Sequence, residues 1–147
     1  MSNVELVLEA FPFDPQQGLE MCTAIPDDGL WVRATELTDP EASVRFILEG
    51  GGAIGSMAGP FHGVEGYRAG WSEWIEPWEE LWVMPLEMID AGEGRVLVIA
   101  QLRGRLRAGG GEVVEDAAGV FQVRDGKVAG IDHYLDRDQA RRAVGLS

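Results

Sequence analysis

Two side chains that could carry out acid and base chemistry lie on the last two β-prone segments of the chain, Glu115 and His133. The imidazole side chain titrates near neutral pH, and a neighbouring carboxylate can hold its tautomer and raise its basicity. On an apolar surface, such a pair could take a proton from one position of an apolar substrate and return it to another. His133 is therefore the candidate proton shuttle and Glu115 its orienter.

Each candidate also has a purely structural interpretation. His133 and Glu115 could form a satisfied hydrogen-bonded pair, or the His133 ring could bond a hydroxyl or carbonyl and do nothing else. His62 precedes Gly63-Val64-Glu65-Gly66 at an expected loop-to-helix junction. There it would either line the mouth of the same cavity or simply be exposed to solvent.

The segment that positions His133 is a β-hairpin around Asp125-Gly126. Two alternating β-prone runs flank this dipeptide, which is the strongest short-range hairpin signal. His133 shares its parity with the apolar Ala129, Ile131 and Leu135, so its side chain is expected to face the core.

The loop length of this hairpin determines the neighbour of His133. A two-residue turn would set His133 opposite Ala118, whereas a three-residue loop with Gly126 in the left-handed conformation would set it opposite Ala117. Only the second register matches apolar face to apolar face, so we expect it. Glu115 would then lie diagonally from His133, with about 7 to 8 Å between the backbones.

The remaining elements follow from periodicity and from breaker residues. Helices are expected over residues 4–11, 16–25, 39–48, 63–76 and 136–144, and strands over 30–37, 80–91, 95–106 and 112–123. Pro85 suggests an edge position or a bulge in the expected strand 80–91. Trp71, Trp74, Trp78 and Trp82 are spaced three, four and four residues apart, which is typical of core packing and also of an aromatic ligand cage.

Composition excludes several classes of function. The net charge of −13 and the single lysine, Lys127, argue against nucleic-acid and membrane partners. Cys22 is the only cysteine, and the two histidines lack ligand spacing, so we expect no disulfide, metal or cofactor. The glycine run at 50–55 lacks the Gly-Lys-Ser/Thr ending of a phosphate loop. A chain of 147 residues without a signal-peptide pattern is expected to be one cytoplasmic domain, 1–147.

Four motifs give the chain a family resemblance: Pro26-Asp27-Asp28 with Trp31, the run Phe61-His62-Gly63-Val64-Glu65-Gly66, Ile89-Asp90-Ala91-Gly92 before Arg95-Val96, and the closing hairpin through Leu146. With these motifs the chain resembles the SnoaL-like, polyketide cyclase type of the nuclear transport factor 2-like superfamily. The resemblance implies an α+β fold in which a cone-shaped, curved antiparallel sheet is wrapped by helices around one apolar pocket, commonly a homodimer through the sheet. Residues 39–59 resemble an insertion into this pattern.

The resemblance constrains the activity less than the fold. The catalytic positions of epoxide hydrolases in this superfamily fall on Ala100, Leu102 and His133, which cannot activate water against an epoxide in the same way. The early tyrosine of ketosteroid isomerase has no counterpart here. The last-strand position, occupied by His133, is where cyclase-type members place an acid or a base.

The leading hypothesis is an isomerase, cyclase or lyase acting on an apolar, carbonyl-bearing substrate. The alternatives are a non-catalytic ligand-binding or dimeric accessory protein, and a protein-interaction module using the arginine and tryptophan surfaces. The residues expected to bind substrate are His62, Trp71, Trp74, Leu102, Ala117, Ile131 and Leu135.

Overall fold

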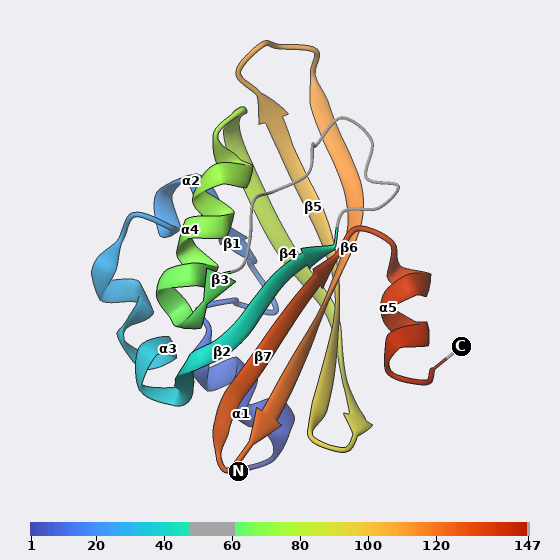
Figure 1. Cartoon of the computed structure of the whole chain (residues 1–147). Coiled ribbons are helices and arrows are strands. Elements are labelled where there is room, and N and C mark those ends of the chain that lie inside the picture. The colour runs from blue at the N-terminus through green and yellow to red at the C-terminus, as the bar shows by residue number, and fades with distance from the viewer. Residues whose placement is uncertain (48–60, 147) are drawn as a thin grey trace.

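The structure, a computed structural model, describes residues 1–47 and 61–146. Most of the helices lie in the first half of the chain, and long strands dominate the second half (Figure 1). In chain order the elements are α1 (Asn3–Ala10), β1 (Leu19–Glu20), α2 (Met21–Ala24), the 3-10 helix η1 (Asp28–Trp31), α3 (Val32–Leu37), β2 (Thr38–Ile47), β3 (Phe61–His62), α4 (Gly63–Ile75), β4 (Trp78–Gly92), β5 (Arg95–Leu106), β6 (Glu112–Arg124), β7 (Lys127–Tyr134) and α5 (Arg137–Ala143).

All the strands in the described part of the chain form one curved sheet in the order β1-β4-β5-β6-β7-β2-β3. Every pairing is antiparallel except that of β2 with β7, so the sheet is mixed and not wholly antiparallel. Helices α1 to α4 cover one face of the sheet and α5 covers part of the other (Figure 1). The expected α+β cone is therefore confirmed.

No helix in the described part of the chain is long and apolar enough to cross a membrane.

The best-predicted helices begin at strong caps. Ser2 and Glu5 form a capping box at the start of α1, in which each side chain accepts a hydrogen bond from the other's backbone N–H. Asp136 caps α5 by accepting from the N–H groups of Asp138 and Gln139. These caps fix both helices close to their expected bounds, and α4 likewise covers most of the expected 63–76.

Three expectations for the first half of the chain are wrong. Residues 30–37 form η1 and α3 instead of a strand, and residues 39–47 form most of β2 instead of a helix. Residues 16–25 form only β1 and the four-residue α2. The rest of the expected insertion, residues 48–60, lies outside the described residues.

Nonlocal pairing explains the error at β2. Asp39-Pro40-Glu41 carries helix-start signals, yet these residues lie at an irregularity between Thr38 and Ser43, where the register with β7 shifts. From Ser43 onward β2 pairs with β7 in regular parallel register. A local helix signal is thus overridden by a strand partner far along the chain.

Irregularities in the long strands direct side chains towards the core. Pro85 lies at a register shift of β4 against β5, as expected for a proline inside a strand. The closing hairpin has a two-residue turn, since Arg124 pairs with Lys127 and both Asp125 (φ 54°) and Gly126 (φ 75°) are left-handed. A second shift, between Gln122 and Val123, adds one residue to β7 and sets His133 opposite Gly119.

The expected register with Ala117 opposite His133 is therefore wrong. Gly119 has the same parity as Ala117, so the apolar faces still match and His133 still faces the interior. A two-residue turn alone would have placed the side chain of His133 on the outer face of the sheet. The extra residue of the bulge in β7 returns it to the inner face, so the bulge and not the loop length sets the orientation of His133.

Two apolar clusters pack against the sheet, one on each face. The larger cluster fills the concave face beneath α1 to α4, and the smaller one lies under α5 and includes Leu97, Ile99 and Tyr134. The larger cluster contains the candidate site.

Candidate functional site

A cavity of about 40 Å³ lies within the larger cluster, between α1, α4 and the concave face of β4 to β7. Its lining is apolar and aromatic apart from the imidazole of His133 and the two indole N–H groups. Its lining residues are Val7, Leu8, Phe11, Phe13, Trp71, Trp74, Val83, Pro85, Met88, Val98, Ala100, Leu102, Ala117, Ala118, Gly119, Phe121, His133 and Tyr134. No residue of this lining is charged. The cavity therefore suits a neutral, mainly apolar molecule.

His133 lies at the centre of an aromatic cluster. Its ring stacks on Phe46 with centroids 5.2 Å apart, and the rings of Tyr67 and Trp71 lie at 5.3 and 5.4 Å. The residue keeps some solvent access, but its Nε2 atom is buried and has no hydrogen-bond partner among the described residues. An imidazole in this setting has one free polar atom facing apolar surroundings.

Burial governs the charge of this histidine. It lowers the pKa of His133 to about 4, and the neighbouring Asp132 carboxylate opposes this only in part. Asp132 itself is held by Arg45, whose Nε and Nη2 atoms donate to its two oxygens at 2.8 and 2.7 Å. His133 is therefore a neutral imidazole at physiological pH.

Two glycines make room for this arrangement. A Cβ on Gly119 would lie 3.4 Å from Nδ1 of His133, so the imidazole rests close to the bare backbone of β6. A Cβ on Gly70 would lie 2.2 Å from the ring of Phe46, so this ring packs directly on α4. Phe46 is thereby placed against the face of His133.

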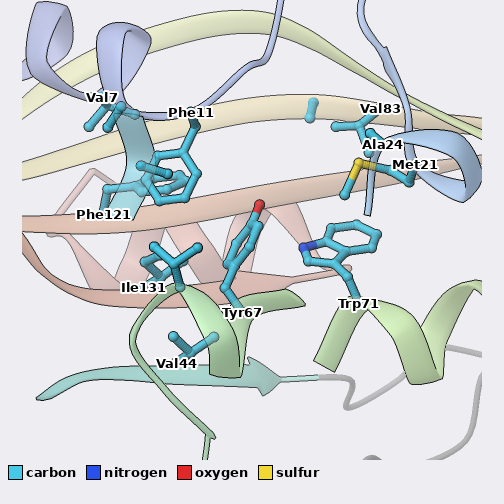
Figure 2. Close-up of a cluster of buried hydrophobic side chains, with 14 of the residues drawn as sticks. Val7, Phe11, Met21, Ala24, Val44, Tyr67, Trp71, Val83, Phe121 and Ile131 are labelled. Carbon is cyan, nitrogen blue, oxygen red and sulfur yellow. The ribbon is translucent and has the colours of Figure 1, made fainter. Parts of the chain in front are cut away.

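Tyr67 brings a second ionisable group to the cluster. Tyr67 and Trp71 project from α4 towards the strands, with the Tyr67 hydroxyl near the Trp71 indole (Figure 2). Burial raises the pKa of Tyr67, and the nearby Trp71 N–H acts in the opposite direction. The Tyr67 hydroxyl and the Trp71 Nε1 do not reach hydrogen-bond geometry, and both atoms are buried without a partner in the described structure. Tyr67 is thus a protonated, uncharged phenol.

Trp71 and Trp74 continue the same face of α4. Their rings stack with centroids 4.9 Å apart at 12°, and both line the cavity. The Nε1 of Trp74 is also buried and unpartnered, as is that of Trp78, which does not line the cavity. By contrast, the indoles of Trp31 and Trp82 donate to Ala24 O at 2.8 Å and to Glu80 Oε1 at 2.6 Å.

Hydrogen bonds outside the cavity hold in place the helices that cover the concave face of the sheet. Arg68 of α4 donates to the carbonyl of Ile25 through Nε and Nη2, at 2.9 and 2.7 Å, and to Asp28 at 2.8 Å. Glu20 accepts from the backbone of Cys22, Thr23 and Leu81, joining α2 to β4. These contacts hold α2 and η1 against α4, from which the aromatic side chains project.

The cysteine next to this junction is not activated. Burial and the negative charge of Glu20 raise the pKa of Cys22 to about 11, and its Sγ lies 3.7 Å from the carbonyl of Trp78. A thiol with a raised pKa is a poor nucleophile at neutral pH.

The residues expected to bind substrate fall into two groups. Trp71, Trp74, Leu102 and Ala117 line the cavity. Ile131 is buried in the larger cluster, Leu135 packs at its margin and His62 is exposed, and none of these three lines the cavity. Substrate binding by any of the seven stays a prediction, which the geometry favours for the first four.

Glu115 does not lie where it was expected. It pairs with Leu102 across β5 and stands four residues along β6 from Gly119, the residue opposite His133. At strand spacing this is about 13 Å, too far for a hydrogen bond to the imidazole. The predicted diagonal contact is wrong because the turn has two residues instead of three and β7 has a one-residue bulge, and each of these moves the register of His133 by one residue from the expected one.

Two residues of the cluster had not been predicted, Tyr67 and Phe46. Tyr67 precedes Trp71 by four residues, so it continues the helical spacing of the tryptophans, and this signal could have identified it. Phe46 lay in a segment expected to be helical, so no sequence signal linked it to His133.

Among the described residues, no group of three histidine, cysteine or acidic side chains could hold a metal ion.

The match to a family profile and the solved structures now give this fold and site a context. The profile of the SnoaL-like domain matches residues 27–131, which is well over half of the chain. The protein therefore belongs to the SnoaL-like domain family. No curated protein matches the sequence.

Several solved structures share the fold across almost the whole chain. A protein from Jannaschia sp. described as a SnoaL-like polyketide cyclase is 20% identical, with a TM-score of 0.64 over 99% of this chain and 92% of its own. An NTF2-like protein from Burkholderia thailandensis is 16% identical, with a TM-score of 0.65 over 97% of both chains. TerC, crystallised with polyporic acid, is 19% identical, with a TM-score of 0.64 over 97% of both chains. Identities this low establish the NTF2-like fold alone.

Proposed function

We propose that the protein binds a small, apolar, carbonyl-bearing molecule in the cavity beside His133. The observation that carries this proposal is the buried, unpartnered Nε2 of a neutral imidazole in an otherwise apolar, uncharged cavity. A buried polar atom without a partner is costly, and a ligand that supplies the partner recovers that cost. Membership of the SnoaL-like family supports a ligand-binding role.

The size of the cavity sets a condition on binding. About 40 Å³ has room for very few atoms, so a ligand must displace some of the surrounding side chains. Leu8 of α1 lies at the margin of the cavity and is partly exposed, so the ligand would enter between α1 and β4.

Binding can be tested with prodan, a neutral naphthyl ketone whose emission shifts to the blue in apolar surroundings. We expect saturable binding to the folded protein, weakened by His133→Ala and by Ala117→Trp, which fills the cavity. Arg103→Gln on the opposite face of the sheet serves as the control and should bind as the wild type does. Binding that is insensitive to both cavity substitutions would contradict the proposal.

Acid and base catalysis is the second candidate function, as in an isomerase, cyclase or lyase. Its specific support is that a neutral base, His133, lies beside a protonated phenol, Tyr67, with ring centroids 5.3 Å apart. Tyr67 could donate a hydrogen bond to a ligand carbonyl while His133 accepts a proton from the adjacent carbon and returns it elsewhere on the same molecule. This pair replaces the expected pair of His133 and Glu115.

Proton exchange separates catalysis from binding. If His133 acts as a base, the protein should accelerate deuterium incorporation next to the carbonyl of a bound ketone in D₂O, followed by NMR, and His133→Gln should abolish the acceleration. The catalytic function would be excluded, and only ligand binding would remain, if deuterium exchange were equally fast with the wild type, with His133→Gln and without protein.

We also propose that the protein is a homodimer through the outer face of β4, β5 and β6 beyond α5. This face exposes Leu86 and Val114 beside Trp82 and Met84. The ion pairs Arg105–Glu80 and Arg103–Glu112 border the same face, and such opposite charges can pair equally well between two copies. Light scattering should give a dimer for the wild type and a monomer for Leu86→Asp, whereas a monomeric wild type would refute the dimer.

A further inference from the structure

The face of α4 that borders the cavity is rich in hydrogen-bond donors. Tyr67, Trp71 and Trp74 follow at spacings of four and three residues and so lie on one side of the helix, where Trp71 and Trp74 line the cavity and Tyr67 lies next to them without lining it. The Tyr67 hydroxyl oxygen and the two indole nitrogens are all buried, and none has a hydrogen-bond partner among the described residues. Most buried polar atoms in folded proteins are paired, so three unpaired donors on one helix face require an explanation.

Pairing within the cluster cannot satisfy all of these donors. An indole N–H only donates, a phenol both donates and accepts, and a neutral imidazole has one donor and one acceptor nitrogen. Tyr67, Trp71, Trp74 and His133 thus present four donors but acceptors only on the phenol oxygen and one ring nitrogen. Even if Trp71 moved to bond Tyr67 and Tyr67 bonded His133, donors would remain without acceptors. Trp74 would be among them, because its ring neighbours are Trp71 and Phe46.

We propose that the cavity selects neutral ligands that carry a hydrogen-bond acceptor and no N–H or O–H donor, such as ketones, esters and quinones. This inference rests on the proposed binding function and narrows its ligand class. A carbonyl oxygen has two lone pairs and can accept from two donors of the α4 face at once. Alcohols would add a donor where donors are already in excess, so they bind more weakly.

Charged ligands are excluded by the same surface. Among residues 1–47 and 61–146, no aspartate, glutamate, lysine or arginine lines the cavity, so neither an ammonium nor a carboxylate would find an opposite charge there. An ammonium group would in addition face N–H and O–H donors. Amines are therefore the least favoured ligands of a given carbon skeleton.

The five tryptophans provide direct reporters of this selection. In a ¹⁵N–¹H spectrum each indole N–H gives one signal, which moves downfield when it donates a hydrogen bond. Trp31 and Trp82 already donate to protein acceptors, and Trp78 is unpartnered but does not line the cavity, so these three signals serve as internal controls. Addition of 1-indanone should move the signal of Trp71, Trp74 or both downfield and leave those of the other three unchanged.

A ligand series with one bicyclic skeleton tests the selection itself. We expect affinity to fall in the order 1-indanone, 1-indanol, 1-aminoindane, and 1-indanone to lose about tenfold in affinity on Trp71→Phe or Trp74→Phe if one hydrogen bond is removed. Indane, which has no acceptor, reports only the change in packing on Trp71→Phe or Trp74→Phe, so 1-indanone should lose about tenfold more affinity than indane does. Trp78→Phe is the matched control, because it removes an unpartnered indole N–H outside the cavity and should leave the affinity for 1-indanone unchanged.

The outcomes distinguish this inference from the function on which it rests. If 1-indanone and 1-indanol bind equally and no indole signal moves downfield, the donor selection is overturned while ligand binding stands. If no member of the series binds the cavity, both are overturned. Tighter binding of 1-aminoindane than of 1-indanone would also refute the selection.

Discussion

Gly119 lies directly opposite His133 across the β6–β7 ladder, and a Cβ at position 119 would lie 3.4 Å from Nδ1 of the imidazole. This pairing depends on the bulge in β7, which sets the register after the Asp125-Gly126 turn. The only imidazole of the cavity is thereby held against a flat piece of backbone, with Phe46 stacked on it. Four predictions follow from this arrangement and its supports.

Stability should fall as the pH drops from about 6.5 to about 4. The folded protein keeps His133 neutral down to a pKa of about 4, whereas the unfolded chain takes up its proton near the ordinary value of 6.5. The unfolded state binds more protons in this window, so this contribution to the free energy of unfolding is fully present above pH 6.5 and is lost as the pH falls. Its size is up to about 3 kcal/mol.

Urea unfolding at several pH values checks this prediction. The difference between the wild type and His133→Phe should change across the window, while His62→Gln, at the other and exposed histidine, should follow the wild type. NMR titration of the His133 ring should show a pKa well below the ordinary value. A pKa near 6.5 in the folded protein would contradict the burial of this ring.

Gly70→Val should remove Phe46 from its place against His133. A Cβ at position 70 already overlaps the Phe46 ring, and the added methyl groups increase this overlap. We expect a loss of about 2 kcal/mol in the free energy of unfolding, measured in urea, from overpacking. Ala69→Val, at an exposed neighbour in α4, should lose only the helix-propensity difference between alanine and valine, about 0.6 kcal/mol. Helix propensity alone would make Gly70→Val more stable by about 0.4 kcal/mol, so a Gly70→Val variant at least as stable as the wild type would show that Phe46 does not pack on Gly70.

Glu20→Gln should destabilise the junction of α2 with β4 by about 1 to 3 kcal/mol, since the carboxylate accepts several hydrogen bonds there. Burial of Glu20 acts to raise its pKa, but the hydrogen bonds from Leu81, Thr23 and Cys22 outweigh it and lower the pKa. A lowered pKa means that this stabilisation is present above the ordinary carboxyl value and is lost as the pH falls below it.

The control for this variant is Glu79→Gln, at an exposed position of β4, which should change the free energy of unfolding by less than about 0.5 kcal/mol. Thermal or urea unfolding at pH 7 compares the two. A loss at Glu20 no larger than that at Glu79 would mean that the carboxylate does not hold the junction together.

Ala117→Val should fill the cavity without harming the fold. Ala117 lines the cavity from β6, and two added methyl groups occupy space that is otherwise empty. We expect the affinity for prodan to fall at least tenfold and the free energy of unfolding to stay within about 1 kcal/mol of the wild type. The matched control is Ala140→Val, which crowds the fully buried contact of α5 on the opposite face. It should lower stability and leave prodan affinity unchanged.

Local signals were sufficient to predict much of the fold. Capping at Ser2 and Asp136 fixed two helices, and strand parity placed His133 inward. The expectations for β2 and α3 failed for different physical reasons. The state of β2 depends on pairing with β7, which no local window contains, whereas the helical spacing of Trp31 and Ala34, both buried, was present in the sequence.

The candidate site was predictable only in part. His133, Trp71 and Trp74 were found from parity and helical spacing, but the companion of His133 was not. The one-residue bulge in β7 determines which side chains lie near the imidazole, and a bulge is difficult to predict from sequence. Glu115 was therefore predicted to be the companion of His133. The side chains that contact the ring are instead those of Phe46 and Tyr67, neither of which is charged.

The parallel pairing of β2 with β7 also bears on how the protein is made. Arg45 of β2 and Asp132 of β7 are 87 residues apart, and Phe46 and His133 are partners in the same ladder. During synthesis, the aromatic face of α4 and Phe46 of β2 must leave the ribosome well before the strand that covers them. Contacts over such long separations form slowly, so this aromatic surface is the part of the nascent chain most in need of protection from aggregation.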